Sequence, residues 1–205
     1  MMDSSKFAGI ILASQSPRRQ KLLEQMGVAF EVIPSELAEM PVMGDRPNVY
    51  VARMALEKAL KVAHSYPDHL IIGADTIVAW EDRILGKPAT GQEAALMLSL
   101  LSGCWHDVWT GLCVCCRKQN IQIVKAAHSS VHFRNVTEAE INEYVETGEP
   151  MDKAGAYAIQ GKGKKFIKEI QGSYHNIVGL PTLELAKIFE TVGIAIDTGS
   201  VEALS

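Results

Sequence analysis

The sequence predicts an α/β fold built on a mixed, twisted sheet with helices on both faces. Short apolar runs of strand length recur along the chain, and segments with helical spacing between them begin at typical helix caps. Strands and helices do not alternate strictly, which favours a mixed sheet over an all-parallel one. The chain of 205 residues is long enough for one sizeable core or two closely packed lobes. We expect a single domain over residues 1–205, with disordered ends at about 1–6 and 197–205.

The composition is that of an ordinary soluble globular protein, with 47% hydrophobic and 21% charged residues. No apolar run approaches the roughly 18 residues of a membrane helix, and the first residues lack an apolar signal region. A net charge of −4 argues against general nucleic-acid binding, for which a basic balance is typical. We therefore expect a cytoplasmic protein whose partners include neither a membrane nor a nucleic acid.

Three of the four cysteines, Cys113, Cys115 and Cys116, lie in one apolar run. In a strand Cys113 and Cys115 share a face, and neither a second cysteine pair nor a histidine pair stands at the spacing of a metal site. Free cysteine behaves as a small buried hydrophobe. Core thiols of a reducing compartment are therefore favoured over a metal or redox site.

The chain begins with a short buried strand at about residues 9–13, followed by a polar turn and a helix. Ser16 occupies the N-cap position and Pro17 the first helical position, so that free backbone N–H groups point back into the turn. Arg18 and Arg19 add forked donors that suit phosphate oxygens. These residues fit an anion site, because a helix N-terminus carries partial positive charge. They fit equally well an ordinary capped helix with two solvated arginines.

An alternating strand at residues 30–33 leads into a segment with two acids, Glu36 and Glu39. Residues 40–48 are rich in Pro, Gly and Asp and are predicted to form a mobile loop. Carboxylates at such a position either bind a hard cation through oxygen or remain solvated. On their own, these two acids favour the solvated alternative.

A long helix is predicted over about residues 48–64, where Asn48 can serve as the cap. Its expected core stripe consists of Val49, Ala52, Leu56, Ala59, Leu60 and Ala63. Lys58 interrupts a second stripe, whose apolar members include Met54, Ala55 and Val62. A lysine among apolar neighbours either extends its ammonium group to solvent or points into a cleft, and this pattern favours the first alternative.

Residues 70–80 have the pattern of a buried strand, yet Asp75 stands in its middle, directly after Gly73 and Ala74. An unpaired buried charge is costly, so this carboxylate needs a cation, a metal or several donors. Small neighbours let a ligand approach, which favours a functional site over a structural salt bridge. If residues 84–88 pair back onto the strand as a hairpin, Lys87 comes near its Asp75 end. Otherwise Lys87 is an exposed lysine before a proline.

In the second half of the chain, helices are predicted at about 90–101, 137–147 and 182–190, and strands at about 108–116, 121–126, 130–133 and 165–170. Capping boxes open the first two of these helices, at Thr90 and Thr137. The expected core of the first consists of Leu96, Met97, Leu100 and Leu101. Residues 149–161 form either a ligand-binding loop or an ordinary glycine-rich connection, in which Gln160 offers both a donor and an acceptor.

Several of these stretches together resemble the Maf family of nucleoside triphosphate pyrophosphatases, and most closely its subfamily that acts on dTTP and UTP. The resemblance runs from about Gly9 to Phe189, with the motifs in the family's order and at similar spacing. The motifs are Ser14-Gln15-Ser16-Pro17-Arg18-Arg19, Gly73-Ala74-Asp75-Thr76, Gly86-Lys87-Pro88, Asp152-Lys153-Ala154-Gly155-Ala156-Tyr157, Ile159-Gln160-Gly161 and Gly179-Leu180-Pro181.

The resemblance implies an α/β fold related to that of inosine triphosphate pyrophosphatases, with two lobes around a cleft and often a homodimer. It implies a phosphate-binding loop made by Ser14, Arg18 and Arg19. Lys58 and Lys87 resemble the family's two cleft lysines, Lys58 in substrate binding and Lys87 in catalysis.

The resemblance also assigns the acids and the amide. Asp75 matches the family's general base or metal-binding acid, Glu39 an acidic helper, and Gln160 a residue near the base or ribose. Asp75 and Glu39 are thus the expected ligands of a divalent cation, Mg²⁺ or Mn²⁺. Two departures stand out: the family often has paired acids where this chain has Ala38-Glu39, and small residues where it has Lys164 and Lys165.

The expected activity is hydrolysis of dTTP or UTP, or of modified pyrimidine nucleotides, to the monophosphate and pyrophosphate. This activity would serve house-cleaning, the removal of such nucleotides from the nucleotide pool. The basic residues and the cation would neutralise charge on the leaving pyrophosphate. Two alternatives remain at this point. One is a non-catalytic, nucleotide-binding regulator of septation and cell division, and the other is a phosphatase that removes the terminal phosphate.

Overall fold

The computed structural model describes residues 6–37, 45–81 and 83–196. Its strands are β1 (Ile10–Leu12), β2 (Glu31–Val32), β3 (Leu70–Trp80), β4 (Arg83–Leu85), β5 (Trp105–Cys116), β6 (Ile121–Phe133) and β7 (Ile167–Gly172). Its α-helices are α1 (Pro17–Gln25), α2 (Pro47–Ser65), α3 (Gly91–Leu101), α4 (Glu138–Glu146), α5 (Tyr174–Val178) and α6 (Thr182–Thr191). Short 3₁₀ turns follow α4, namely η1 (Glu149–Asp152), η2 (Ala154–Ala156) and η3 (Lys162–Phe166).

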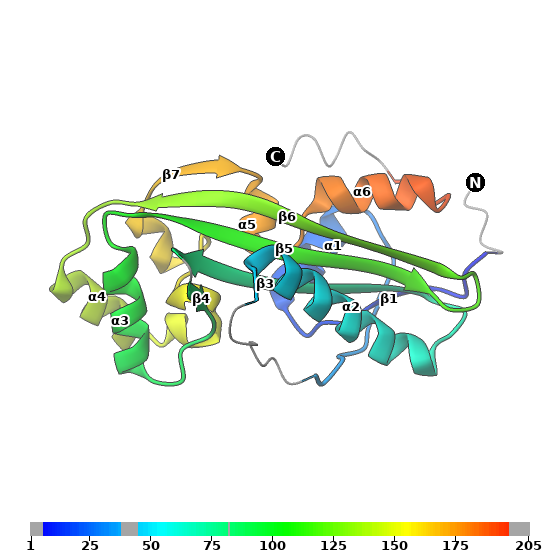
Figure 1. The fold of residues 1–205 in the computed structure, drawn as a ribbon, viewed down its shortest axis with the longest axis horizontal. Helices are drawn as coiled ribbons and strands as arrows, with labels where there is room; N and C mark the ends of the chain where they lie inside the picture. Colours follow the sequence, from blue (N-terminus) through cyan, green and yellow to red (C-terminus); the bar gives the residue numbers. More distant parts are fainter. Residues whose placement is uncertain (1–5, 38–44, 82, 197–205) are drawn as a thin grey trace. The chain divides into compact units, whose positions relative to one another are not determined.

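The strands pair in the order β2-β1-β3-β5-β6-β7, and β4 pairs with β3 (Figure 1). β1 is parallel to both β2 and β3, whereas the β3–β4 and β6–β7 pairs are antiparallel. The parallel β1–β3 pair needs a long crossover, which the chain makes through α1, β2 and α2. The predicted α/β fold with a mixed sheet is therefore confirmed.

The chain divides into two compact units. Unit 1 comprises the chain up to Asp75, then Thr110–Ala127 and the chain from Gly179, and unit 2 comprises Thr76–Trp109 and His128–Val178. The long strands β3, β5 and β6 contribute residues to both units. The predicted disordered end at 197–205, and all of the other end except Lys6, lie outside the described residues.

Unit 1 has helices on both faces of its strands. The strand residues Ile11, Ile71 and Cys113 form one buried cluster with Ala55 and Ala59 of α2. Because side chains alternate along a strand, the equally buried Leu12, Ile72 and Val114 point to the opposite face. Figure 1 shows α2 in front of these strands and α1 behind them. The cysteines of β5 are buried free thiols, as predicted.

Helix α2 lies unusually close to the sheet at two glycines. A Cβ atom at Gly73 would collide with the backbone carbonyl of Ala55, and one at Gly111 would collide with that of Val51. Both collisions involve helix backbone, which cannot rotate away as a side chain can. The absence of side chains on β3 and β5 at these positions therefore sets the distance between helix and sheet.

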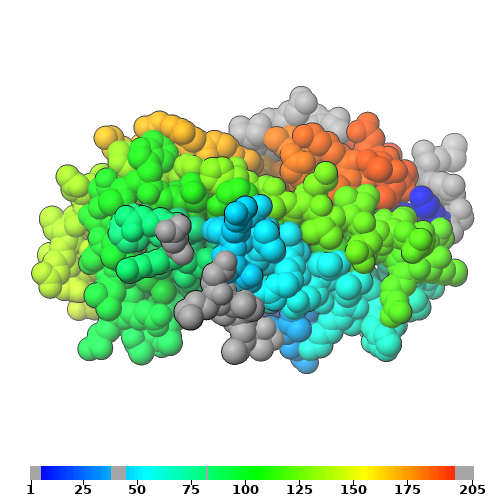
Figure 2. Space-filling model, in the orientation of Figure 1, coloured from blue at the N-terminus to red at the C-terminus, as the bar shows by residue number. Residues whose placement is uncertain are grey.

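The predicted core stripe of α2 is confirmed at Ala59 and Ala63 but wrong at Val49 and Leu60, and this close approach explains why. Val49 is 52% exposed and Leu60 is 39% exposed, and the helix packs instead through Tyr50, Val51, Met54, Ala55, Lys58, Ala59, Val62 and Ala63. A helix seated on glycines needs small residues at the contact, and the stripe with Ala55, Ala59 and Ala63 supplies them. The outer face of α2 forms part of the surface of unit 1 (Figure 2, cyan). The helix also begins earlier than predicted, with Arg46 as N-cap and Pro47 at the first position.

Unit 2 differs from prediction in three local features. Leu96 of α3, expected in the core, is 67% exposed, whereas Met97 and Leu101 are buried. The two strands predicted at 121–126 and 130–133 are one continuous strand, β6. The residues just before β7 form η3 rather than strand. The capping box at the start of α4 is confirmed, because Thr137 and Glu140 exchange both hydrogen bonds.

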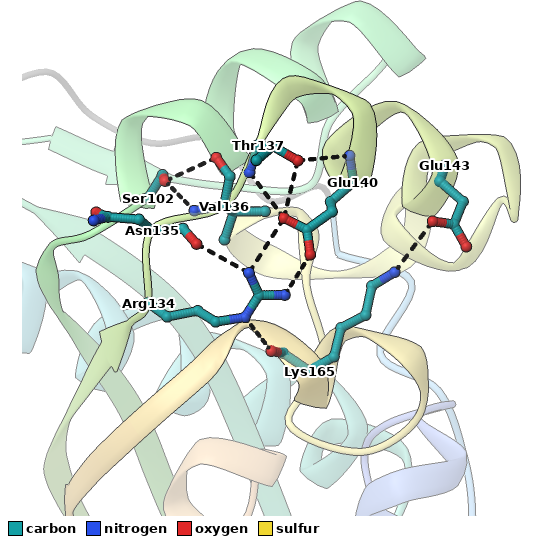
Figure 3. A network of polar contacts seen from close by, with 8 residues as sticks. All are labelled: Ser102, Arg134, Asn135, Val136, Thr137, Glu140, Glu143 and Lys165. Atoms are coloured by element: carbon teal, nitrogen blue, oxygen red, sulfur yellow. Dashed lines mark hydrogen bonds and ion pairs between the residues drawn. The ribbon is translucent and has the colours of Figure 1, made fainter.

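An arginine ties the end of β6 to two other elements of unit 2 (Figure 3). Arg134 donates two hydrogen bonds to the Glu140 carboxylate on α4, at 3.2 and 2.7 Å, and its Nε donates to the backbone carbonyl of Lys165 at 2.9 Å. Arg134 and Thr137 together lower the pKa of Glu140 to about 2. Glu140 therefore stays ionised, and the bidentate pair holds, throughout the neutral pH range.

The core of unit 2 contains a buried histidine among aromatic rings. His106 Nε2 lies 2.8 Å from the Tyr157 hydroxyl, and its ring meets those of Phe133 and Tyr157 edge-on. His106 is 3% exposed, and its burial lowers its pKa from 6.5 to about 4. The folded protein thus binds fewer protons than the unfolded chain between pH 4 and 6.5.

This titration predicts that stability rises with pH across that window. The neutral imidazole of His106 should make the free energy of unfolding about 3 kcal/mol lower at pH 4 than at pH 7. Replacing His106→Phe should flatten this part of the profile, because the ring that must be protonated on acid unfolding is gone. Urea denaturation of both proteins at several pH values measures the difference. If the unfolding free energies of the two proteins changed with pH in parallel, His106 would not be the group responsible for this pH dependence.

None of the helices in the described ranges 6–37, 45–81 and 83–196 has the length and apolar character needed to cross a membrane.

Candidate functional site

The turn between β1 and α1 has the predicted helix start. Ser16 is the N-cap and Pro17 the first residue of α1, but the Ser16 side chain makes no capping hydrogen bond. The nearby Ser14 hydroxyl instead accepts from the backbone N–H of Ser16 at 3.3 Å and from Arg19 Nη1 at 3.0 Å. Ser14 is buried. The turn is therefore stiffened by hydrogen bonds to the Ser14 hydroxyl rather than by an ordinary serine cap.

Arg19 also crosses to a distant segment of unit 1. Its Nε donates to the backbone carbonyl of Gly179 at 2.8 Å. The Gly179-Leu180-Pro181 motif is buried and leads directly into α6. Arg19 thus links two of the motifs singled out in the sequence, the first and the last, and holds a cationic group over the start of α1.

The two ionisable residues that stood out in apolar stretches form a buried ion pair. Lys58 Nζ on α2 lies 2.6 Å from Asp75 Oδ1 on β3. Lys58 is 6% exposed and Asp75 is 4% exposed. The interpretation of Lys58 as a lysine that extends to solvent is therefore wrong. Gly73 and Asp75 lie on the same face of β3, so the glycine contact with α2 brings the helix within reach of the carboxylate.

This ion pair stands on the strand next to the one that leads into the Ser14 turn. β1 and β3 are parallel, with Leu12 opposite Ile72, and the N–H of Ala13 donates to the carbonyl of Ile72 at 2.8 Å. The carboxyl ends of adjacent parallel strands are the usual place for ligands in open α/β sheets. Asp75 follows Ile72 by three residues and Ser14 follows Leu12 by two. Unit 1 therefore brings the turn after β1 beside the middle of β3, where Asp75 stands.

The charges in this part of unit 1 suit a polyanion. Arg18 and Arg19 add two positive charges to the partial charge at the start of α1, while Lys58 already neutralises the Asp75 carboxylate. Arginine is the side chain best shaped for phosphate oxygens. A ligand with several phosphates would meet the positive charges of Arg18 and Arg19 here, while the Asp75 carboxylate is paired with Lys58.

Lys87 and Gln160 belong to unit 2. The predicted hairpin is confirmed, because Val78 pairs with Leu85, and this register carries the chain after β4 back along β3 towards Thr76. Lys87 is exposed there. Gln160 is also exposed, directly after the buried Ile159. Their roles stay predictions from the family resemblance.

The acidic helper predicted from the sequence, Glu39, lies outside the described residues, as does most of the predicted mobile loop. The neighbouring Glu36 is described and exposed, and its backbone carbonyl accepts from Lys61 Nζ at 2.9 Å. Glu36 adopts a positive φ of 47°. The role of Glu39 therefore stays a prediction.

The loop that contains Gln160 depends on a residue whose role was not predicted from the sequence, Glu149. The Glu149 carboxylate accepts from the backbone N–H groups of Lys162 and Gly163, at 3.0 and 3.1 Å, and from the Tyr144 hydroxyl at 2.9 Å. Burial raises the pKa of Glu149, but these hydrogen bonds lower it by more, so that the net shift is downward. Its partners stand 13 and 14 residues away, a separation that no local sequence pattern reveals.

The predicted divalent cation can be compared with the donors present. In the part of the chain that the structure describes, no three or more His, Cys, Asp or Glu residues form a group that could hold a metal. Mg²⁺ is commonly bound by one or two carboxylates together with substrate phosphates. The single Asp75 carboxylate fits that mode of binding.

Comparisons with known proteins identify the family of this chain. A family model described as Maf-like protein matches residues 9–192. A dTTP/UTP pyrophosphatase of Bacillus cereus (strain AH820) is 48% identical over 178 residues, 87% of this chain and 92% of that protein. A dTTP/UTP pyrophosphatase of Desulfotalea psychrophila (strain LSv54 / DSM 12343) is 44% identical over the same length, 87% of this chain and 91% of that protein.

Among solved structures, the Staphylococcus aureus Ham1 protein is similar with a TM-score of 0.48 and 14% identity, over 89% of this chain and 98% of that one. The family model covers most of the chain, and relatives along 87% of it share nearly half of the aligned residues. The chain therefore belongs to the family of Maf-like proteins.

Proposed function

We propose that this protein is a nucleoside triphosphate pyrophosphatase that hydrolyses dTTP and UTP to the nucleoside monophosphate and pyrophosphate. Relatives that are 44–48% identical carry the name dTTP/UTP pyrophosphatase. The observation that carries the proposal is the buried Lys58–Asp75 pair on β3, the strand that pairs with β1 just before the Ser14–Arg19 turn. Cationic donors near a carboxylate suit hydrolysis of a phosphoanhydride, because they stabilise the charge that develops on the leaving phosphates.

The proposed roles follow from charge and position. The N–H groups at the start of α1, with Ser14, Arg18 and Arg19, bind the phosphates. Asp75 accepts a proton from the water that attacks the α-phosphorus, and the bond between that phosphorus and the bridging oxygen to the β-phosphate breaks. Lys58 holds the Asp75 carboxylate in place through the ion pair at 2.6 Å.

The remaining predicted residues complete the proposal. Lys87 neutralises charge on the leaving pyrophosphate, Gln160 contacts the base or ribose, and Glu39 assists Asp75. A divalent cation, Mg²⁺ or Mn²⁺, held by Asp75 and Glu39 would supply further charge neutralisation when bound. A cytoplasmic location is proposed because the four free cysteines suit a reducing compartment. A homodimer is proposed from the family resemblance alone.

Measuring both phosphate products tests the proposal. The purified protein is incubated with UTP, dTTP, CTP, ATP and GTP, each with Mg²⁺ or Mn²⁺, and pyrophosphate and orthophosphate are quantified separately. We expect pyrophosphate and the monophosphate in equal amounts, and the highest kcat/KM for UTP and dTTP. Orthophosphate with the nucleoside diphosphate would identify a terminal phosphatase instead. Nucleotide binding without release of either product would identify a non-catalytic regulator. The name of the relatives, dTTP/UTP pyrophosphatase, does not favour this alternative.

A further inference from the structure

The Glu149 carboxylate closes the loop that carries Gln160. Glu149 opens η1, and its two oxygens reach forward to the first backbone N–H groups of η3, those of Lys162 and Gly163. The first N–H groups of a helical turn have no partners within the turn, so an anion placed there satisfies them. Residues 149–163 are thus tied into a closed loop by one side chain.

The Glu149 carboxylate also lies against the backbone of Gly161. Gly161 has a φ of +90°, a conformation that side chains rarely adopt, and a Cβ atom there would lie 2.9 Å from both Glu149 oxygens. The backbone immediately after Gln160 therefore rests against the carboxylate with no room for a side chain. A shift of Glu149 would move this backbone, and Gln160 with it.

Glu149 is itself held from two sides within unit 2. The Tyr144 hydroxyl, near the end of α4, donates to Oε1 at 2.9 Å, and Lys153 Nζ donates to the Glu149 backbone carbonyl at 2.8 Å. Lys153 also pairs with the Asp152 carboxylate. The acid and lysine of the Asp152-Lys153 motif thus support the position of Glu149.

The far end of η3 is held independently. Arg134 donates to the carbonyl of Lys165, and Phe166 is fully buried against the rings of Phe133 and Tyr144 (Figure 3 shows the Arg134 contacts). Before Gln160, the run Tyr157, Ala158 and Ile159 is also buried. Gln160 is the first exposed residue after this buried run, and the Glu149 contacts follow it directly on its C-terminal side.

We propose that Glu149 is a positioning residue that determines base selectivity, by fixing the loop in which the Gln160 amide meets the pyrimidine base. This inference rests on the proposed function, in which Gln160 contacts the base. Uracil and thymine offer an N–H donor between two carbonyl acceptors, and an amide with one donor and one acceptor complements such an edge only when its orientation is fixed. A site that reads such a pattern discriminates far better than one that only fills space.

A charge-removing pair of variants tests this role. Glu149→Gln keeps the size of the side chain but turns one acceptor into an N–H₂ donor that faces a backbone N–H. Glu146→Gln removes the same charge from the exposed face of α4 and serves as the matched control. Tyr144→Phe removes a single hydrogen bond and leaves the Glu149 charge in place, so it remains informative if Glu149→Gln folds poorly.

Two readouts separate positioning from a general structural role. Hydrogen–deuterium exchange should show faster exchange of the Lys162 and Gly163 amides in Glu149→Gln, while exchange in β3 is unchanged. In kinetics, KM for UTP should rise about tenfold with kcat within about threefold, and the preference for UTP over GTP should fall about tenfold. Tyr144→Phe should shift both quantities in the same direction by less, and Glu146→Gln should match the wild type.

The possible results separate the role of Glu149 in selectivity, its positioning role and the proposed function. Equal losses of kcat/KM for UTP and GTP, or an unchanged UTP preference despite faster amide exchange, would overturn the role in selectivity. Unchanged amide exchange in Glu149→Gln would overturn the positioning role itself. If the wild-type protein released no pyrophosphate from UTP, the proposed function would fail instead. In that case the preference for UTP over GTP, measured as equilibrium binding to the same variants, decides the inference by the same criteria.

Discussion

Asp75→Asn should lose pyrophosphate release from UTP by at least about a thousandfold, because the amide cannot take the proton of the attacking water. The same variant should also lose about 3–5 kcal/mol of unfolding free energy, since it leaves the buried Lys58 ammonium without a counter-charge. Low activity of Asp75→Asn alone would therefore not separate the loss of the proton acceptor from the loss of stability. Urea denaturation and product release at saturating UTP measure the two effects separately.

The double variant Lys58→Met with Asp75→Asn separates them. It removes both charges from the buried site, and replacing a buried ion pair by neutral groups is often nearly neutral for stability. We expect most of the lost unfolding free energy to return while pyrophosphate release stays absent. Recovery of turnover together with stability would show that Asp75 is a structural partner of Lys58 and not the proton acceptor.

Gly111→Ala should have the largest effect on stability among the glycine substitutions. The added methyl group would collide with the backbone carbonyl of Val51 in α2, and a helix backbone relieves such a collision only by moving away from the sheet. We expect a loss of about 3 kcal/mol or more in unfolding free energy, at the upper end of the usual cost of overpacking. Because Lys58 is carried on α2, the surviving folded protein should also lose kcat.

Gly86→Ala is the matched control for this substitution. A Cβ atom at Gly86 would meet no other atom within 4 Å, so its unfolding free energy should change by less than about 0.5 kcal/mol. Denaturant titrations of the two variants in parallel provide the comparison. A stability of Gly111→Ala equal to that of Gly86→Ala would refute the idea that this glycine seats α2 on the sheet.

Local features of this chain were predictable because their partners lie close in sequence. Ser16 with Pro17 places the start of α1, and Thr137 with Glu140 places the start of α4. The hairpin of β3 and β4 follows from two apolar arms around a short turn. In each case the atoms that determine the structure are within a few residues of one another.

Features that depend on distant partners were predicted incompletely or wrongly. Leu96 has the helical spacing of a core residue, but only the packing around α3 decides which side of that helix is covered. In α2 the predicted stripe was right at Ala59 and Ala63 but wrong at Val49 and Leu60, because only the contact with the sheet decides which positions are covered. Glu149 gave no local signal, because its partners lie beyond the next turns of the chain.

The α/β class, the starts of α1 and α4, the buried thiols and the isolated charges could be predicted from the chain alone, because periodicity and capping are properties of neighbouring residues. It also placed Asp75 and Lys58 as charges out of place in apolar surroundings. That these two charges are partners became clear only from the folded packing. Gly73 and Gly111 let α2 pack closely onto the sheet, and this contact brings Lys58 to within 2.6 Å of Asp75, 17 residues away in the sequence.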